Sequence, residues 1–133
     1  MKLLDSTFIV DFLRKRIESE RALEILRGET VFTTRINFFE VLTGIFSLKS
    51  EAERERHFAD AFMLFERIGI LELDEKSAIK ASQIAGELNK SGAHIEPNDC
   101  LTAGISLSNE IEIIVTRNIK HFQAIKGLKI ETY

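Results

Sequence analysis

The stretch that decides the fold is Ile36-Asn37-Phe38-Phe39-Glu40-Val41-Leu42-Thr43-Gly44-Ile45-Phe46. Hydrophobic residues occupy most of its positions, so a helix built from it is hydrophobic on almost all sides. A helix of this kind is covered on most sides, within its own domain or by a second copy of the chain. Glu40 lies in its middle, and an ionised carboxylate is costly to desolvate unless it is paired. Glu40 therefore reaches the surface, pairs with a nearby arginine, or faces a site that requires negative charge.

The chain of 133 residues has the composition of a soluble globular protein, with 44% hydrophobic and 29% charged residues. We expect a single domain spanning residues 1–133. The formal net charge of −3 provides no overall basic surface, so a nucleic-acid partner requires a local basic patch or bridging metal ions. The single cysteine excludes an intrachain disulfide. No segment resembles a signal peptide or a membrane span, so we expect a cytoplasmic α/β domain with no membrane partner.

Five short hydrophobic segments have the character of buried strands: residues 2–4, 31–33, 70–73, 112–116 and 128–132. Strands that alternate with helices are typical of a parallel sheet covered by helices on both faces. In open sheets of this kind, functional sites form beyond the carboxyl ends of the strands, where the strand order reverses. The ends of these strands are therefore the first place to look for chemistry.

Helical segments are expected over residues 8–13, 17–27, 35–46, 51–69, 75–91, 98–108 and 120–125. Thr34, Ser50 and Asp74 stand where capping residues are needed at helix N-termini. Gly69 is expected to end the fourth helix. Small residues in the sixth helix, among them Gly104, predict that this helix packs closely against the sheet.

Polar residues gather at the expected strand ends and helix starts. Asp5 follows the first strand and Asn118 follows the fourth, while Glu40 and Asp99 lie near helix starts. Taken singly, Asp5 and Asn118 are explained as helix caps, and Asp99 as a favourable charge in a first helical turn. Taken together, three carboxylates and an amide at one edge of a sheet repel one another and require a cation. Such oxygen ligands suit Mg²⁺ or Mn²⁺, and metal-bound water at such a site predicts hydrolysis of a phosphodiester.

Four segments carry a resemblance to a known family: Leu4-Asp5-Ser6-Thr7, Asn37-Phe38-Phe39-Glu40-Val41, Asn98-Asp99-Cys100-Leu101-Thr102-Ala103, and Val115-Thr116-Arg117-Asn118 with His121-Phe122. In this order and spacing they resemble a PIN domain, and more narrowly the toxin nuclease of VapBC toxin–antitoxin pairs. The resemblance implies a three-layer α/β/α sandwich with a central parallel sheet of four to five strands. It also implies cleavage of RNA with one or two Mg²⁺ or Mn²⁺ ions, a homodimer, and inhibition by a small VapB-like antitoxin. By position, Asp5, Glu40 and Asp99 match the acidic catalytic and metal-site residues of the family.

The fourth position departs from the fullest form of that pattern, because the family often has Asp where this chain has Asn118. An amide oxygen still binds Mg²⁺ but contributes no charge. We therefore expect weaker occupancy of one metal position, a single tightly held ion and lower activity. Glu96, one turn before Asp99, is a candidate to restore the charge, with a helix cap or solvated acid as the alternative. Thr116 is a candidate partner of a metal-bound water, with plain strand propensity as the alternative.

The remaining polar residues have weaker claims. His121 lies one turn beyond Asn118, where it either touches substrate or is simply solvated. Cys100 is expected to be a small packing residue, since no base stands near it in the sequence. Two basic clusters, residues 14–16 and Arg117 with Lys120, either contact RNA phosphates or form solvated helix faces.

Three other functions compete with metal-dependent cleavage. A phosphatase of the haloacid-dehalogenase type needs a second Asp two residues after the first, where this chain has Thr7. A response-receiver domain needs its phosphoacceptor Asp at the end of the third strand, where Asp74 is better explained as a cap. The third alternative is a catalytically weak PIN module that binds RNA or a protein partner without cleavage, and Asn118 is the feature that favours it.

Overall fold

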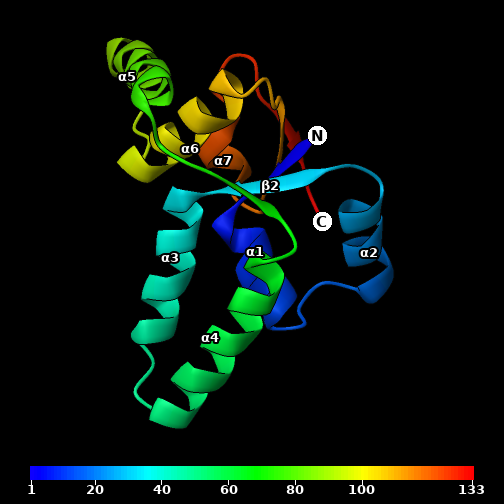
Figure 1. The fold of residues 1–133 in the computed structure, drawn as a ribbon. Coiled ribbons are helices and arrows are strands. Elements are labelled where there is room, and N and C mark those ends of the chain that lie inside the picture. The colour runs from blue at the N-terminus through cyan, green and yellow to red at the C-terminus, as the bar shows by residue number, and fades with distance from the viewer.

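A computed structural model describes residues 1–133 and shows one sheet of five parallel strands in the order β3-β2-β1-β4-β5 (Figure 1). The strands are β1 (Lys2–Leu4), β2 (Val31–Thr34), β3 (Gly69–Leu71), β4 (Ile113–Val115) and β5 (Lys129–Glu131). The helices are α1 (Ser6–Leu13), α2 (Ser19–Arg27), α3 (Arg35–Phe46), α4 (Glu51–Phe65), α5 (Glu75–Lys90), α6 (Pro97–Ser108) and α7 (Ile119–Phe122). The predicted three-layer α/β/α fold with a parallel sheet is confirmed.

Each face of the sheet buries its own hydrophobic core, because successive residues of a strand point to opposite faces. Leu4 and Val115 pack into a cluster with side chains of α1, α2, α3 and α4. Leu3 and Ile114 pack into a second cluster with side chains of α5, α6 and α7. Figure 1 shows the same division, with α1, α3 and α4 on one side of the strands and α5, α6 and α7 on the other.

The strand order reverses beside β1, and this position fixes where a site forms. From β1 the chain moves outward through β2 to β3, and it then returns to add β4 and β5 on the other side of β1. The carboxyl ends of β1 and β4 therefore lie next to each other, with Leu4 paired to Val115. Asp5 and Thr116 follow directly, so they meet at the switch point of the sheet.

Gly69 does not end a helix, so that prediction was wrong. Helix α4 ends at Phe65, and Gly69 is the first residue of β3. A Cβ atom at Gly69 would lie 2.5 Å from the ring of Phe32 on the neighbouring strand. The glycine is needed because that ring crosses the backbone of β3, a close approach that a local sequence pattern does not reveal.

The small residues of α6 pack in a different direction from the one predicted. A Cβ atom at Gly104 would lie 2.6 Å from the backbone nitrogen of Ala81, so the glycine allows α6 to approach α5. Ala103, one position earlier, belongs to the core against the sheet. Close packing on the sheet therefore involves Ala103, while Gly104 determines the spacing between two helices.

The hydrophobic helix α3 is covered on only part of its circumference. Val41 and Ile45 are buried in the core, whereas Phe39 and Phe46 are each 62% exposed. Within this chain, then, the expectation that the helix is covered on most sides is not met at these two phenylalanines. None of the helices has both the length and the apolar character needed to cross a membrane.

Candidate active site

An open pocket of about 300 Å³ lies at the carboxyl ends of β1 and β4. It has no hydrophobic lining residue, and it is lined by Asp5, Ser6, Glu40, Glu96, Pro97, Asn98, Asp99, Asn118 and His121. These residues come from the start of α1, the middle of α3, the start of α6 and the segment that leads from β4 into α7. Of the residues predicted for the site, all except Thr116 line this one pocket.

Asp5 is a buried carboxylate that is held by two hydroxyl groups. Its Oδ2 accepts hydrogen bonds from Thr116 Oγ1 at 2.7 Å and from Thr7 Oγ1 at 3.0 Å. The explanation of its side chain as a helix cap is wrong, because Asp5 stands at the N-cap position of α1 but its side chain makes no capping hydrogen bond. The Thr116 hydroxyl donates to the carboxylate itself, and its contact with a metal-bound water stays a prediction. Both hydroxyls bind the same oxygen, which leaves Oδ1 without a hydrogen bond inside the protein.

Glu40 faces the pocket, which settles the three alternatives that the sequence left open. The nearby Arg35 does not pair with it, because Nε and Nη2 of Arg35 donate to Glu72 instead. Burial raises the pKa of Glu40, and the negative charges of Asp5 and Asp99 raise it further. Hydrogen bonding from Ser6 and Asn98 lowers the same pKa and offsets part of that rise. Burial and the two neighbouring acids therefore both disfavour the ionised form of this carboxylate.

Buried Asn37 fixes the position of Glu40 relative to the other acids, a role that the sequence did not reveal. The side chain of Thr34 caps α3 by accepting from the Asn37 backbone nitrogen at 3.0 Å. Asn37 Nδ2 donates to the carbonyl of Leu4 at 3.2 Å, and its Oδ1 accepts from Thr102 of α6 at 3.4 Å. One fully buried amide thus ties the first turn of α3 to the end of β1 and to α6.

Asp99 is paired with His121, which the sequence offered only as a residue that touches substrate or is solvated. The His121 Nδ1 atom lies 2.7 Å from Asp99 Oδ2. Burial raises the pKa of Asp99, the hydrogen bond from His121 lowers it, and the charges of Asp5 and Glu96 raise it again. The spacing from Asn118 places His121 near the site, but no local pattern shows that it contacts Asp99, which is 22 residues away in the sequence.

Asn118 and Glu96 are the two remaining oxygen donors at the rim of the pocket. Each stands at the N-cap position of a helix, α7 for Asn118 and α6 for Glu96, and neither side chain makes a capping hydrogen bond. The explanation of both residues as side-chain caps is therefore wrong. Asp74, in contrast, is confirmed as the cap of α5, since its Oδ1 accepts from the Ser77 backbone nitrogen at 2.8 Å.

The donors around the pocket fit a hard divalent cation in kind and number. Carboxylate and amide oxygens are the ligands that Mg²⁺ and Mn²⁺ prefer, and burial together with neighbouring acids raises the pKa values of Glu40 and Asp99. No group of three His, Cys, Asp or Glu side chains already closes around one point. Cation binding would therefore need these side chains to move closer together.

Comparison with known proteins gives consistent results for sequence and for structure. The chain is 28% identical over 131 residues to the tRNA(fMet)-specific endonuclease VapC of Salmonella typhimurium, covering 98% of this chain and 96% of that one. The Shigella flexneri protein of the same name matches with the same identity and coverage. Among solved structures, VapBC2 from Rickettsia felis bound to a promoter DNA fragment matches with a TM-score of 0.87 at 25% identity, over 99% of this chain and 98% of that chain. DNA-bound VapBC from Salmonella typhimurium matches with a TM-score of 0.86 at 26% identity, over 98% and 96%.

The family assignment follows from a match to a family model across almost the whole sequence. The model of the PIN domain matches residues 2–128. Its span contains β1 to β4, all seven helices and every residue that lines the pocket. The chain therefore belongs to the PIN domain family.

Proposed function

We propose that this protein is a divalent-metal-dependent endoribonuclease and the toxin of a toxin–antitoxin pair. The observation that carries the proposal is the convergence of three carboxylates, Asp5, Glu40 and Asp99, on one polar pocket at the switch point of the sheet. Relatives named as endonucleases match over 98% of the chain, which supports nuclease activity. The same relatives are named for a tRNA, which favours RNA as the substrate.

In this proposal Asp5, Glu40, Asp99 and Asn118 hold one or two Mg²⁺ or Mn²⁺ ions. Such an ion, when bound, activates a water molecule and neutralises charge on the phosphate. The protein supplies the orientation: Thr7 and Thr116 fix Asp5 through one oxygen and leave the other for the pocket. Because three carboxylates repel a polyanionic strand, balancing their charge strengthens the binding of RNA at the pocket.

Asn118 lowers the negative charge of the site, and Glu96 partly restores that charge. An amide is neutral, so the site has one negative charge fewer than a site with four acids. Glu96 lies on the rim and its charge reaches Asp99. We therefore propose one firmly bound ion rather than two equal ones, with Glu96 as a supporting ligand.

The test is RNA cleavage by purified, antitoxin-free protein with Mn²⁺, Mg²⁺ or EDTA. Wild type is expected to cut RNA only with a divalent ion, and Asp5→Asn is expected to lose at least about a hundredfold in rate, the range of a lost electrostatic catalytic group. Asp60→Asn on α4 is the matched control, since Asp60 is an exposed acid outside the pocket. Cleavage that persists in EDTA or in Asp5→Asn would contradict the proposal.

The second candidate function is a PIN module that binds RNA or a protein partner without cutting. Asn118 is the observation that favours it, because the amide leaves the site short of charge. Asn118→Asp separates the two candidates. A modest gain in the rate of an already active wild type supports the nuclease, whereas an inactive wild type with bound RNA supports the binding module.

The proposed partners are an antitoxin and a second copy of this chain. Matching structures of VapBC complexes support an antitoxin.

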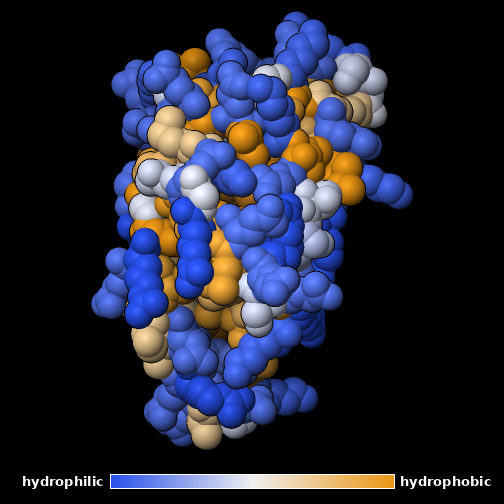
Figure 2. Space-filling view, turned by 90° about the vertical axis from the view of Figure 1, so that its right-hand side faces the viewer, coloured by the Kyte–Doolittle hydropathy of each residue, from blue (hydrophilic) through white to orange (hydrophobic).

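We propose a hydrophobic groove as a surface for a protein partner. The groove has a volume of about 440 Å³, lies between α1, α2 and α4, and has eight hydrophobic lining residues, with Leu23 and Met63 exposed at its edge. Figure 2 shows the side of the molecule that carries α2, where hydrophobic surface lies between charged side chains. Exposed Phe39 and Phe46 on α3 support a homodimer, and we propose the cytoplasm as its location.

A further inference from the structure

A buried carboxylate outside the pocket connects segments from the beginning and the end of the chain. Asp11 on α1 is only 3% exposed. Its Oδ2 accepts from Tyr133 Oη at 2.9 Å and lies 2.9 Å from Nη1 of Arg117. Nη1 of Arg16 lies 3.6 Å from its other oxygen, which has no hydrogen-bond partner. One arginine from each of the two basic clusters that the sequence shows separately therefore lies at this carboxylate.

Arg16 is brought to this position by the way α1 ends. Lys15 adopts a left-handed conformation with φ of 56°. The Lys15 nitrogen donates to the Phe12 carbonyl at 3.1 Å and the Arg16 nitrogen donates to the Asp11 carbonyl at 2.8 Å. These two bonds form a Schellman motif. The motif folds the chain back, so that Arg16 lies beside the side chain of Asp11.

Arg117 is brought there by the end of β4. Thr116 points towards Asp5, Arg117 points to Asp11, and Asn118 lines the pocket. The Arg117 nitrogen also donates to Thr7 Oγ1 at 3.2 Å, and Thr7 in turn binds Asp5. The backbone of Arg117 is therefore connected through Thr7 to the carboxylate at the pocket.

The cluster has positive charge to spare. Two guanidinium groups share one carboxylate, and Tyr133 stays neutral because burial and the hydrogen bond to Asp11 raise its pKa to about 12. A guanidinium has five N–H donors, and Asp11 engages one nitrogen of each arginine. The side chains of Arg16 and Arg117 remain 54% and 58% exposed. The carboxylate thus forms a close ion pair with Arg117 and a longer one, at 3.6 Å, with Arg16, while most donors of both arginines face solvent.

We propose that Arg16 and Arg117, held by Asp11, form a binding site for a backbone phosphate of the RNA strand next to the pocket. Asp5 is the N-cap of α1 and Asp11 lies six residues later, about 9 Å along the helix axis, so the pair would contact a phosphate near the one at the carboxylates. Arginine presents paired donors that match phosphate oxygens, and a guanidinium that is already oriented loses less entropy on binding. This inference rests on the proposed function, because it requires a nucleic-acid strand at the pocket.

The experiment measures the salt dependence of binding, in EDTA, of a short fluorescein-labelled single-stranded RNA to the Asp5→Asn protein. Arg16→Gln is expected to weaken binding about threefold at low salt and to reduce the slope of log K against log salt by about 0.7, the value for one phosphate contact of a single strand. Arg117→Gln leaves Asp11 with fewer partners and can destabilise the fold. The double variant Asp11→Asn/Arg117→Gln, compared with Asp11→Asn alone, gives the contribution of Arg117 without that problem.

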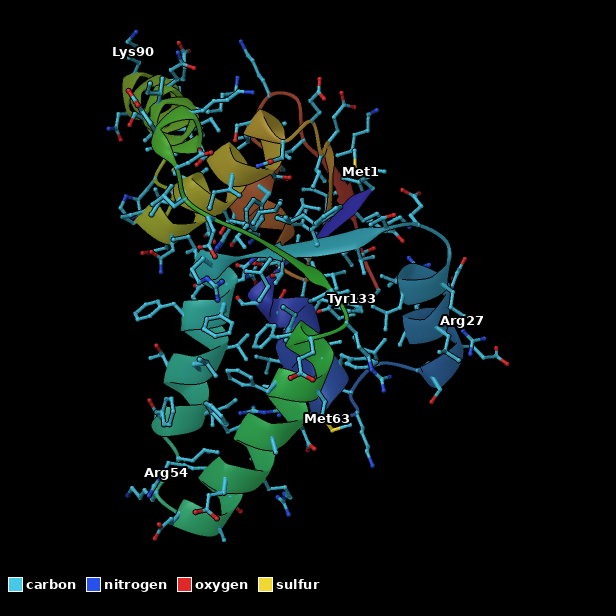
Figure 3. The ribbon with its side chains drawn as sticks, in the orientation of Figure 1. Met1, Arg27, Arg54, Met63, Lys90 and Tyr133 are labelled. Carbon is cyan, nitrogen blue, oxygen red and sulfur yellow. The ribbon has the colours of Figure 1, made fainter.

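Arg27→Gln is the matched control, because Arg27 is exposed on α2, on the opposite side of the molecule from α3 and α6 (Figure 3). It is expected to leave the slope unchanged. Unchanged slopes for Arg16 and Arg117, even with a lower melting temperature, would show that the arginines only tie the chain together, which overturns the inference. Binding of polyglutamate to the same variants is measured in parallel. If the arginine variants bind polyglutamate more weakly but keep the full RNA slope, the two arginines bind an acidic protein, which also overturns the inference.

The two proposals fail in different ways. A wild type that cleaves RNA with Mn²⁺ while the arginine variants keep the full slope contradicts only the phosphate site. A wild type that never cleaves while the slope falls as expected contradicts only the nuclease, and leaves a nucleic-acid contact at Arg16 and Arg117.

Discussion

The carboxylates of the pocket differ in how the protein treats their charge. Asp5 receives two hydroxyl donors, whereas burial and neighbouring acids raise the pKa values of Glu40 and Asp99. A protein that stabilised only its fold would have little use for two acids in this state. In the proposed function this charge binds a cation, and the fold is less stable for it.

Glu40→Gln tests this trade in metal-free protein. The pKa of Glu40 is raised above its ordinary value of 4.5, so the folded state binds a proton more tightly than the unfolded chain. The ionised carboxylate therefore lowers the free energy of unfolding at neutral pH, and the loss disappears as the pH falls through the raised pKa towards 4.5. We expect Glu40→Gln to be more stable than wild type at pH 7, by less than about 1 kcal/mol because half-exposed charges are screened. The gain should vanish in acid.

Urea unfolding with EDTA across that pH range measures the difference. A second arm adds Mn²⁺, which should raise the melting temperature of wild type more than that of Glu40→Gln. A variant that is less stable than wild type at neutral pH would mean that Glu40 makes net favourable contacts in the fold.

His121 is expected to hold Asp99 in the orientation that a cation needs. Partners of this kind typically change metal affinity by about 10- to 100-fold. His121→Ala should therefore weaken Mn²⁺ binding, measured calorimetrically, by about tenfold, while His121→Asn keeps a donor near the Nδ1 position and retains most of the affinity. His94→Ala is the control, since His94 is exposed and outside the pocket. Equal affinities for the alanine and asparagine variants would argue against the positioning role.

At the scale of elements, the contact between α5 and α6 depends on one glycine. A Cβ at Gly104 meets the Ala81 backbone at 2.6 Å, whereas a Cβ at Gly86 of α5 meets nothing within 4 Å. Gly104→Ala should lower the free energy of unfolding by about 2 kcal/mol, as overpacking does. Gly86→Ala should raise it by about 0.5–1 kcal/mol, since alanine favours a helix. Two variants that shift stability in the same direction would show that α6 does not pack against α5 in this way.

The ends of α1 and α6 share one backbone geometry with a residue that is unfavourable there. Lys15 has φ of 56° and Glu110 has φ of 60°, and the Glu110 and Ile111 nitrogens repeat the hydrogen bonds seen after α1. Glycine relieves the strain of a left-handed residue, so Lys15→Gly and Glu110→Gly should each add about 0.5–1 kcal/mol of stability. Thermal unfolding measures both, and a loss of stability in either would show that its side chain contributes more than the strain costs.

At the scale of the whole molecule, the last residue closes the structure against the first helix. Tyr133 donates to Asp11, packs edge-on to Phe8 with ring centroids 5.2 Å apart, and lies beside α1 (Figure 3). It is the only tyrosine, and there is no tryptophan, so its absorbance reports this contact alone. The pKa of Tyr133 is raised from 10.0 to about 12.

The folded state favours the neutral phenol of Tyr133 more than the unfolded chain does. Its contribution to the free energy of unfolding is therefore complete below pH 10 and is lost as the pH rises towards 12. Near pH 11, we expect little tyrosinate absorbance in folded protein and a large signal in urea, as the ordinary value of about 10 requires. Asp11→Asn should lower the tyrosine pKa. Tyrosine ionisation near pH 10 in the folded protein would mean that the C-terminus is not held against α1.

Most of the fold is predictable because its signals are local. Alternating strands and helices predict a parallel sheet, and Thr34 and Asp74 cap the helices that they were expected to cap. The wrong predictions concern what two glycines pack against. Gly69 makes room for the ring of Phe32, and Gly104 makes room for the backbone of Ala81. A glycine signals the absence of a side chain, but only packing shows what fills that space.

For the site, the sequence alone determined which residue types were available at strand ends and helix starts, since local patterns place those positions in the chain. Only the tertiary structure decided that Asp5, Glu40, Asp99 and Asn118 line one pocket, that His121 binds Asp99, and that Arg16 and Arg117 share Asp11. The physical reason is that charge interactions depend on distance in space, and residues 16 and 117 become neighbours only when the sheet forms.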